Sequence, residues 1–254
     1  LENPPEKLLV NKAGDPVVIE LRKKSGEVKT FSVRTLKNEK YVIYRSWVEK
    51  NRRYVNSKGF GYVHIPDMMA QGFSEFFRLY TYEVFKYGSV VVDIRYNGGG
   101  HVSQLLLERL LTKRIAVDIP RRGEPIPYPL VAPTRLVLIV NEQAGSDADI
   151  FTNSFKLYKL GKVIGTRTWG GVVGIDSRYS LVDGTLVTQP KYAFWFINVG
   201  FGVENYGVDP DIVVDNLPQD YMRGVDRQLE VAIEELKKEE VVDSVKLFQG
   251  SRNS

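Results

Sequence analysis

Two loops of this 254-residue sequence carry residue types suited to nucleophilic chemistry. In the first loop, three consecutive glycines at positions 98–100 follow an apolar segment and precede a helical pattern. In the second loop, Ser146 follows Gly145 at a similar strand-to-helix junction. Consecutive glycines let backbone N–H groups turn toward a bound anion or oxyanion. A serine at such a junction can attack a carbonyl carbon while amides at the helix N-terminus stabilise the oxyanion that develops.

Both loops also have simpler explanations. The Ser-x-x-Asp pattern at residues 146–149 is a helix-capping signature, and a serine at an N-cap usually only binds backbone amides. The glycine run is equally suited to a plain tight turn, and it lacks the Lys-Ser/Thr of a P-loop and the spacing of GxGxxG. On the residues alone, both interpretations of each loop stay open.

A serine nucleophile needs a base, and the sequence offers no clear one. His64 lies within a strand pattern, where a packed side chain is the usual outcome, and His101 opens a helix whose dipole disfavours the charged imidazole. No Ser-x-x-Lys motif occurs. Glu204, in a glycine-rich segment, is the carboxylate best placed to orient a base, although a lone glutamate in a turn is more often simply exposed.

The composition excludes several classes of protein and site. Without cysteine, the chain has no disulfides, thiolate nucleophiles or cysteine-ligated metals, and two histidines cannot build a multi-histidine metal site. A net charge of +4 without a basic run argues against a nucleic-acid partner. No apolar run approaches the ~20 residues of a membrane span. We therefore expect no metal, cofactor, nucleic acid or membrane partner, and chemistry from hydroxyls, carboxylates and backbone amides.

The elements that must position these residues follow an α/β pattern. Buried strands are expected at residues 60–65, 89–96 and 135–141. The helices that follow them are expected at residues 72–87, 101–113 and 146–160. Further strands are expected at residues 162–166, 178–182, 185–190 and 192–198, before an amphipathic helix at 226–238. Repeated strand–helix units predict a parallel sheet covered by helices, which binds ligands at the carboxyl ends of its strands.

The first forty residues form a small separate piece. Strand patterns at 17–24 and 27–33 flank Ser25-Gly26, which favours a tight hairpin. A piece of about forty residues rarely builds a sufficient core alone. We therefore expect it to be part of a larger domain, and the chain to be a fragment of a longer polypeptide.

The sequence resembles the C-terminal part of the tricorn protease family, within the tail-specific serine peptidases. The matching strings run in order from about Tyr41 to Asp211 and include VVDIRYNGGG, NEQAGSDADIF, IGTRTWGGVVG and GFGVENYGVDPD. The first forty residues resemble the second half of a PDZ domain. The resemblance implies a PDZ-like portion at 1–40 and a serine peptidase core at 41–254, folded as a crotonase-like αβ sandwich with a partly parallel sheet and covering helices.

The resemblance also implies roles for individual residues. Ser146 is expected to be the nucleophile, with the amides of Gly99 and Asp147 as the oxyanion hole, and Glu204 to orient the catalytic histidine. The Asp147 side chain is expected to favour a basic residue on the acyl side of the cleaved bond, because carboxylates pair with Lys and Arg. Asp118 is a further acidic candidate, supplied by a neighbouring subunit. All of this requires Gly99 and Ser146 to converge in space.

One departure from the family pattern matters for activity. In this family the catalytic histidine belongs to a helical domain upstream of the PDZ domain, and no part of this sequence matches that domain. We therefore expect the isolated chain to be inactive. For the whole protein, the resemblance implies peptide substrates, a cytoplasmic location and ring-shaped homohexamers.

Two alternatives from other functional classes stay open. The same fold occurs in proteins that resemble retinoid-binding repeats, and the aromatic residues near 192–201 would suit an apolar ligand pocket, although alternating aromatics in strands are more often core. The chain would then be a non-catalytic binding module. It would instead be an assembly module if its apolar surface served only to join subunits of a large complex.

Overall fold

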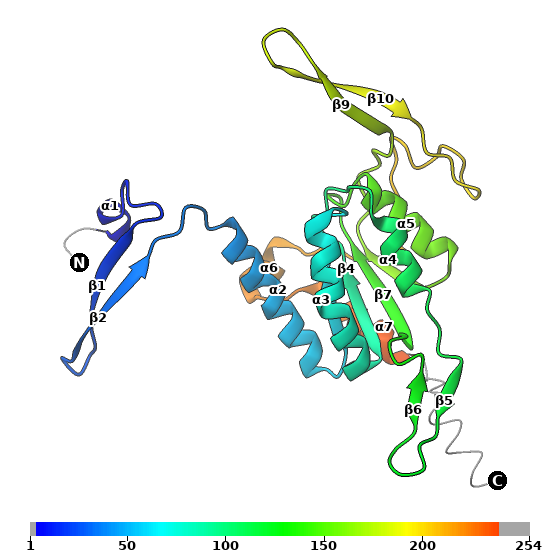
Figure 1. Ribbon diagram of the computed structural model, residues 1–254, viewed down its shortest axis with the longest axis horizontal. Helices are drawn as coiled ribbons and strands as arrows, with labels where there is room; N and C mark the ends of the chain where they lie inside the picture. Colours follow the sequence, from blue (N-terminus) through cyan, green and yellow to red (C-terminus); the bar gives the residue numbers. More distant parts are fainter. Residues whose placement is uncertain (1–3, 239–254) are drawn as a thin grey trace. The chain divides into compact units, whose positions relative to one another are not determined.

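A computed structural model describes residues 4–238 of the chain (Figure 1). The chain divides into two compact units, Leu1–Lys50 and Asn51–Ser254. The first unit holds a short helix α1 (Pro5–Leu8) and the antiparallel hairpin of β1 (Pro16–Arg22) and β2 (Val28–Arg34). Its turn contains Gly26 at a φ of +87°, so the hairpin expected around Ser25-Gly26 is confirmed. Helix α2 (Lys40–Ser57) leads into the second unit.

A five-stranded parallel sheet forms the centre of the second unit. Its strands, in spatial order, are β11 (Ile212–Val213), β8 (Gly161–Gly165), β7 (Arg135–Val140), β4 (Ser89–Asp93) and β3 (Gly61–His64). Every residue of β3 and β4 is buried. The apolar runs that predicted buried strands therefore correspond to strands of a sheet that is covered on both faces, as parallel sheets usually are, and even the edge strand β3 is buried.

Helices cover this sheet on its two faces. The main apolar core packs α3 (Ala70–Tyr87), α4 (Ser103–Leu110) and α5 (Asp147–Leu157) against one face. Helix α7 (Arg227–Lys238) contacts β7, β8 and β4, and its buried side chains include Leu229 and Ile233. The expected α/β fold with a parallel sheet and covering helices is confirmed. Within the described residues, no helix has both the length and the apolar content that a membrane span requires.

The loops that carry the candidate chemistry lie side by side because β4 and β7 are parallel neighbours. Their residues pair from Ser89 with Arg135 to Asp93 with Ile139, and Ile94 N–H then donates to the Ile139 carbonyl at 3.0 Å. The chain leaves β4 into the glycine loop and leaves β7 into the Ser146 loop. Both loops therefore emerge at the same carboxyl-terminal edge of the sheet, as the sequence predicted.

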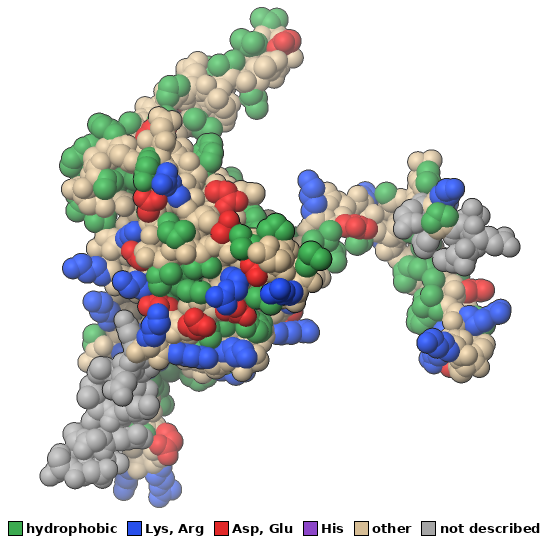
Figure 2. Space-filling view, turned by 180° about the vertical axis from the view of Figure 1, so that it is seen from behind, with side chains coloured by type: hydrophobic (Ala, Val, Ile, Leu, Met, Phe, Trp, Pro, Cys, Tyr) green, Lys and Arg blue, Asp and Glu red, His purple; other side chains and the backbone are tan. Residues whose placement is uncertain are grey.

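Smaller elements complete the second unit (Figure 1). They are the hairpin of β5 (Ala116–Asp118) and β6 (Ile126–Tyr128), the two-stranded sheet of β9 (Gly174–Ser180) and β10 (Leu186–Tyr192), and helix α6 (Pro218–Arg223). Figure 2 shows Lys and Arg side chains interspersed with Asp and Glu on the reverse face of this unit. Charges of the two signs are thus mixed on that face.

One strand prediction is wrong. Residues 192–198 were expected to form a strand, but beyond Tyr192 the chain is irregular and turns back, with Phe196 and Gly200 exchanging backbone hydrogen bonds. The sequence alternates because Phe196 is buried in a small cluster while Trp195 and Ile197 are exposed. The alternation of apolar residues here therefore reflects alternating burial in an irregular segment, and it does not mark a strand.

A buried ionic network joins the end of β4 to the start of α7. Arg95 is 2% exposed, and its guanidinium lies 2.7 Å from Asp93 Oδ2 and 2.8 Å from Asp226 Oδ2. Tyr62 also donates its hydroxyl proton to Asp93 at 2.8 Å. Burial acts to raise the pKa of Asp93, but Arg95 outweighs it and holds the pKa below its ordinary value. Asp93 thus stays ionised inside the protein.

We predict that Arg95→Met lowers the free energy of unfolding by about 3–5 kcal/mol, because it leaves the Asp93 carboxylate buried without a cation. Chemical denaturation measures this loss. Arg227→Ala, which breaks an exposed ion pair with Glu230, is the matched control and leaves stability nearly unchanged. In the wild type, the stability that Asp93 supplies is present at neutral pH and is lost as the pH falls through its lowered pKa. Equal stability of both variants would contradict the prediction.

Candidate active site

Ser146 has a strained backbone at the junction of β7 and α5. Its φ of 55° and ψ of −119° lie where L-residues other than glycine rarely occur. It occupies the N-cap position of α5, but its side chain makes no capping hydrogen bond. Within the described part of the chain its hydroxyl has no hydrogen-bond partner. The capping interpretation is therefore wrong for this side chain, and strain of this kind is concentrated at functional sites.

The glycine loop touches the Ser146 turn. A Cβ atom placed on Gly99, whose φ is +91°, would lie 2.5 Å from Ser146 Cβ and 3.0 Å from the Asp147 nitrogen. Any side chain at position 99 would therefore collide with the turn at Ser146. The two loops converge as the sequence predicted, and the plain-turn explanation does not account for this contact.

The two amides expected to bind an oxyanion differ in their present partners. The Asp147 N–H, at the first residue of α5, donates no hydrogen bond to any described residue. The Gly99 N–H donates to Asn97 Oδ1 at 2.9 Å. An oxyanion at this position would therefore find the Asp147 donor available but would have to share the Gly99 donor with Asn97.

Asn97 holds the two loops and the end of β3 together. Its side chain is fully buried; Oδ1 accepts from Gly99 and Nδ2 donates to the Ile65 carbonyl at 2.9 Å. Its backbone carbonyl accepts the Gly145 N–H at 2.9 Å, next to Ser146. Sequence reasoning missed this residue, although an asparagine immediately before a glycine run is a signal for such a turn.

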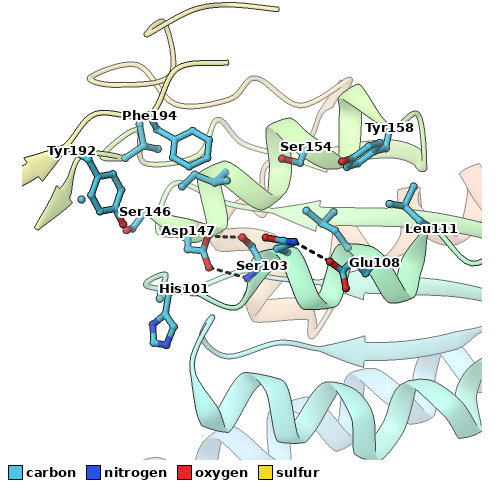
Figure 3. A pocket seen from close by; sticks show the side chains of 16 residues that line it. His101, Ser103, Glu108, Leu111, Ser146, Asp147, Ser154, Tyr158, Tyr192 and Phe194 are labelled. Atoms are coloured by element: carbon cyan, nitrogen blue, oxygen red, sulfur yellow. Dashed lines mark hydrogen bonds between the residues drawn. The ribbon is translucent and has the colours of Figure 1, made fainter. Parts of the chain in front are cut away.

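A cavity of 460 Å³ opens beside Ser146 and runs between α4 and α5 (Figure 3). That volume falls in the range of small-ligand and side-chain pockets. Its lining combines aliphatic, aromatic and acidic side chains, among them Leu107, Leu111, Ile150, Tyr158, Val172, Tyr192, Phe194, Asp147 and Glu108. The mixture suits a long side chain with an apolar stem and a cationic end.

The two carboxylates of this cavity differ in how free they are. Asp147 is 6% exposed, and Ser103 donates its hydroxyl to Oδ1 at 2.5 Å and its amide to Oδ2 at 3.0 Å (Figure 3). Glu108 is exposed and accepts one hydrogen bond, from Gln104 Nε2 at 2.9 Å. Asp147 thus anchors the start of α4, whereas Glu108, which sequence reasoning missed, has capacity left for a ligand.

Glu204 does not line the cavity itself, but it binds a residue that does. Its Oε2 accepts the N–H groups of Val172 and Val173 at 2.7 and 2.9 Å, and Val172 itself lines the cavity. Glu204 is partly buried and makes no hydrogen bond to Ser146 in the structure. Its Oε1 has no hydrogen-bond partner among the described residues.

The remaining candidates do not supply a base to Ser146. His64 is 2% exposed, its Nε2 is 3.0 Å from the Arg95 carbonyl oxygen, and burial lowers its pKa. His101 lies at the cavity with its ring directed away from Ser146 (Figure 3). Asp118 lies on β5, between the end of α4 and the start of β7, and so at the opposite edge of the sheet from Ser146 in the same chain.

Comparison with known proteins shows to which family the chain belongs. Residues 59–214 match Peptidase family S41, and they include the sheet, both loops and Glu204. The chain belongs to peptidase family S41. The match covers more than half of the described residues, and both loops of the candidate site lie within it.

The S41 chain is most informatively compared with tricorn proteins. It is 56% identical over 230 residues to the tricorn protease homolog of Saccharolobus solfataricus and 52% identical over 237 residues to the tricorn protease of Thermoplasma acidophilum. These alignments cover 89% and 92% of this chain but 21% and 22% of the relatives. A crystal structure of the tricorn protease matches with a TM-score of 0.85 and 50% identity, over 91% of this chain and 23% of that one. The resemblance seen in the sequence is confirmed, and the chain spans about a fifth of these relatives.

We predict that Asn97→Ala lowers the free energy of unfolding by about 1–3 kcal/mol, because it leaves the buried Ile65 carbonyl and Gly99 amide without a partner. Urea denaturation measures the loss. Gln143→Ala, which removes an exposed side chain from the loop before Ser146, is the control and has little effect. Equal stability of Asn97→Ala and wild type would show that Asn97 does not hold the loops together.

Proposed function

We propose that the complete gene product is a serine peptidase that hydrolyses peptides with Ser146 as its nucleophile. The supporting observation is the strained Ser146 turn, which meets Gly99 beside a cavity and has a hydroxyl without a partner among the described residues. Membership in family S41 supports the same activity.

In the proposed reaction, Ser146 Oγ attacks the peptide carbonyl carbon and its proton passes to a base. The carbonyl oxygen becomes an oxyanion that the Asp147 and Gly99 amides stabilise. The C–N bond then breaks, the base returns the proton to the leaving amine, and an acyl-enzyme remains. Water, deprotonated by the same base, hydrolyses the acyl-enzyme and restores the serine.

The base in this proposal is a histidine from a part of the complete gene product that this sequence does not include, and Glu204 orients it. Because two amides already fix Glu204 Oε2, the carboxylate is rigid and its Oε1 is left to accept an imidazole N–H. Such a bond would set the tautomer of the histidine, so that the other ring nitrogen faces Ser146.

Ser146→Ala in the complete gene product should abolish labelling by a fluorophosphonate probe and lower peptide turnover by about 10⁶-fold. Ser57→Ala is the matched control, because Ser57 is an exposed serine at the end of α2 that does not line the cavity. It should leave both readouts near wild type. Labelling that persists in Ser146→Ala would remove Ser146 from its role and favour the binding-module alternative.

Residues 1–254 expressed alone should show no practical turnover. Loss of a positioned base costs about 10²–10⁴ in rate, and up to about 10⁶ where the residues act as a unit. The measurement compares hydrolysis of an Arg-ending fluorogenic peptide by this chain and by the complete gene product. Equal rates would refute the missing base, and the exposed His101 would then become the candidate.

We further propose that the enzyme prefers a Lys or Arg side chain on the acyl side of the cleaved bond. Two acidic residues, Asp147 and Glu108, lie in the cavity beside Ser146. Since both oxygens of Asp147 already accept hydrogen bonds from Ser103, Glu108 is the carboxylate with the greater capacity to pair with a cation. The apolar lining would pack against the stem of the basic side chain.

Glu108→Gln should raise KM for Arg- and Lys-ending peptides by about 1.5- to 5-fold while leaving a Leu-ending peptide unchanged, because an exposed ion pair is worth little more. Asp147→Asn should lower turnover of both peptides, since it weakens the anchor to α4. Steady-state kinetics on matched peptides measures both. An unchanged Arg-to-Leu preference in Glu108→Gln would exclude Glu108 from recognition.

We also retain the organisation that the tricorn resemblance implies. We propose that residues 1–40 are the C-terminal portion of a PDZ-like domain and that residues 41–254 form a crotonase-like peptidase core. The β-hairpin of the first unit supports the former. The whole protein is proposed to be a cytoplasmic homo-oligomer in which Asp118 reaches a neighbouring subunit's site, because the β5–β6 hairpin lies between α4 and β7, away from Ser146 of the same chain.

A further inference from the structure

Asp149 is a completely buried carboxylate in the first turn of α5, close to Ser146. It lies three residues after Ser146 and is 0% exposed. Its Oδ1 accepts the Gly170 N–H at 2.9 Å. Its Oδ2 is buried without a hydrogen-bond partner in the described part of the chain. A buried carboxylate is costly to retain, so its contacts call for an explanation.

The groups around Asp149 come from two different segments. Burial raises its pKa, while the Thr168 hydroxyl and the amides of Gly170, Ser146 and Gly171 act to lower it. The Thr168 hydroxyl oxygen accepts the Val208 N–H at 2.8 Å, which leaves its proton to point elsewhere. Asp149 thus stands between the nucleophile turn and the segment 168–171, with donors from both.

That segment in turn touches the loop that carries Glu204. The Gly170 carbonyl accepts the Asn205 N–H at 2.7 Å, and a Cβ on Gly170 would lie 2.4 Å from the Gly207 nitrogen. The next two amides after Gly171 hold the Glu204 carboxylate. We define residues 168–173 as the bridging loop, because they contact Asp149 on one side and residues 204–207 on the other.

We propose that Asp149 is a positioning residue that fixes the bridging loop, and through it Glu204, relative to Ser146. Its Oδ1 supplies a side-chain bond from α5 to Gly170, at the centre of that loop. The proposal rests on the proposed function of Ser146 and Glu204. A misplacement of catalytic groups by about 1 Å can cost about 10²-fold in rate, so loosening this bond would be felt at the nucleophile.

The test uses the complete gene product and three variants. Asp149→Ala removes the acceptor and should slow fluorophosphonate labelling by about 10- to 100-fold, with kcat falling by more than KM rises, because Val172 is the one residue of the bridging loop that lines the cavity. Asp149→Asn keeps an oxygen for Gly170 and should stay within about threefold of wild type. Thr152→Val is the control for a buried polar loss on the same helix, and it should label like wild type. Should the alanine variant fail to fold, Asp149→Ser, too short to reach Gly170, takes its place.

Hydrogen–deuterium exchange separates this proposal from the proposed function. In Asp149→Ala the amides of the bridging loop should exchange about fivefold faster or more, and in Asp149→Asn they should not. Unchanged exchange, or equal labelling of Asp149→Ala and wild type, overturns the positioning role. Absence of labelling in the wild type, together with faster exchange in the alanine variant, overturns the nucleophile assignment and leaves the positioning of the loop intact.

Discussion

The hydrogen bonds of Asn97 are the constraint on which the arrangement of the site depends. A parallel sheet places its strand ends at one edge, but it does not fix where the loops beyond them go. Asn97 does so, because its amide group joins the β3 end at Ile65 to Gly99 while its carbonyl receives the Gly145 N–H. Three segments distant in sequence thus meet at one buried side chain, and the Ser146 turn is held against the glycine loop.

The same kind of support recurs around Ser146. Asp147 anchors α4, Glu204 holds the amides after Gly171, and Asp149 accepts from Gly170. Each is a carboxylate that accepts hydrogen bonds from backbone N–H groups of another segment. A hydrogen bond to an ionised acceptor is stronger than one between neutral groups. Apolar packing, by contrast, is concentrated between the sheet and its helices. The core therefore sets the distance between layers, while polar side chains set the geometry of the loops.

The sheet, its helices and the convergence of the two loops could be predicted from the sequence. Apolar runs in the sequence, such as those at 89–93 and 135–140, predict buried strands, and parallel strands bring their carboxyl ends to the same side of the sheet. The rest depends on contacts between distant residues: Asn97 bonds Ile65, Asp149 bonds Gly170, and Glu108 matters only because α5 lies opposite. The strand predicted at residues 192–198 is wrong because alternating apolar residues indicate which side chains are buried. They do not indicate whether a neighbouring strand is present to pair with.

The two hydrogen bonds that Ser103 donates to Asp147 limit which mutations this site can accept. Asp147, whose amide we propose stabilises the oxyanion, also lines the cavity beside Ser146 and anchors the start of α4. A mutation that alters its charge therefore disturbs architecture, recognition and rate together. Glu108 lines the same cavity but accepts a hydrogen bond only from Gln104, within its own helix. Changes in substrate preference are thus expected to arise by substitution near the end of α4, at positions such as Glu108, while Asp147 changes little.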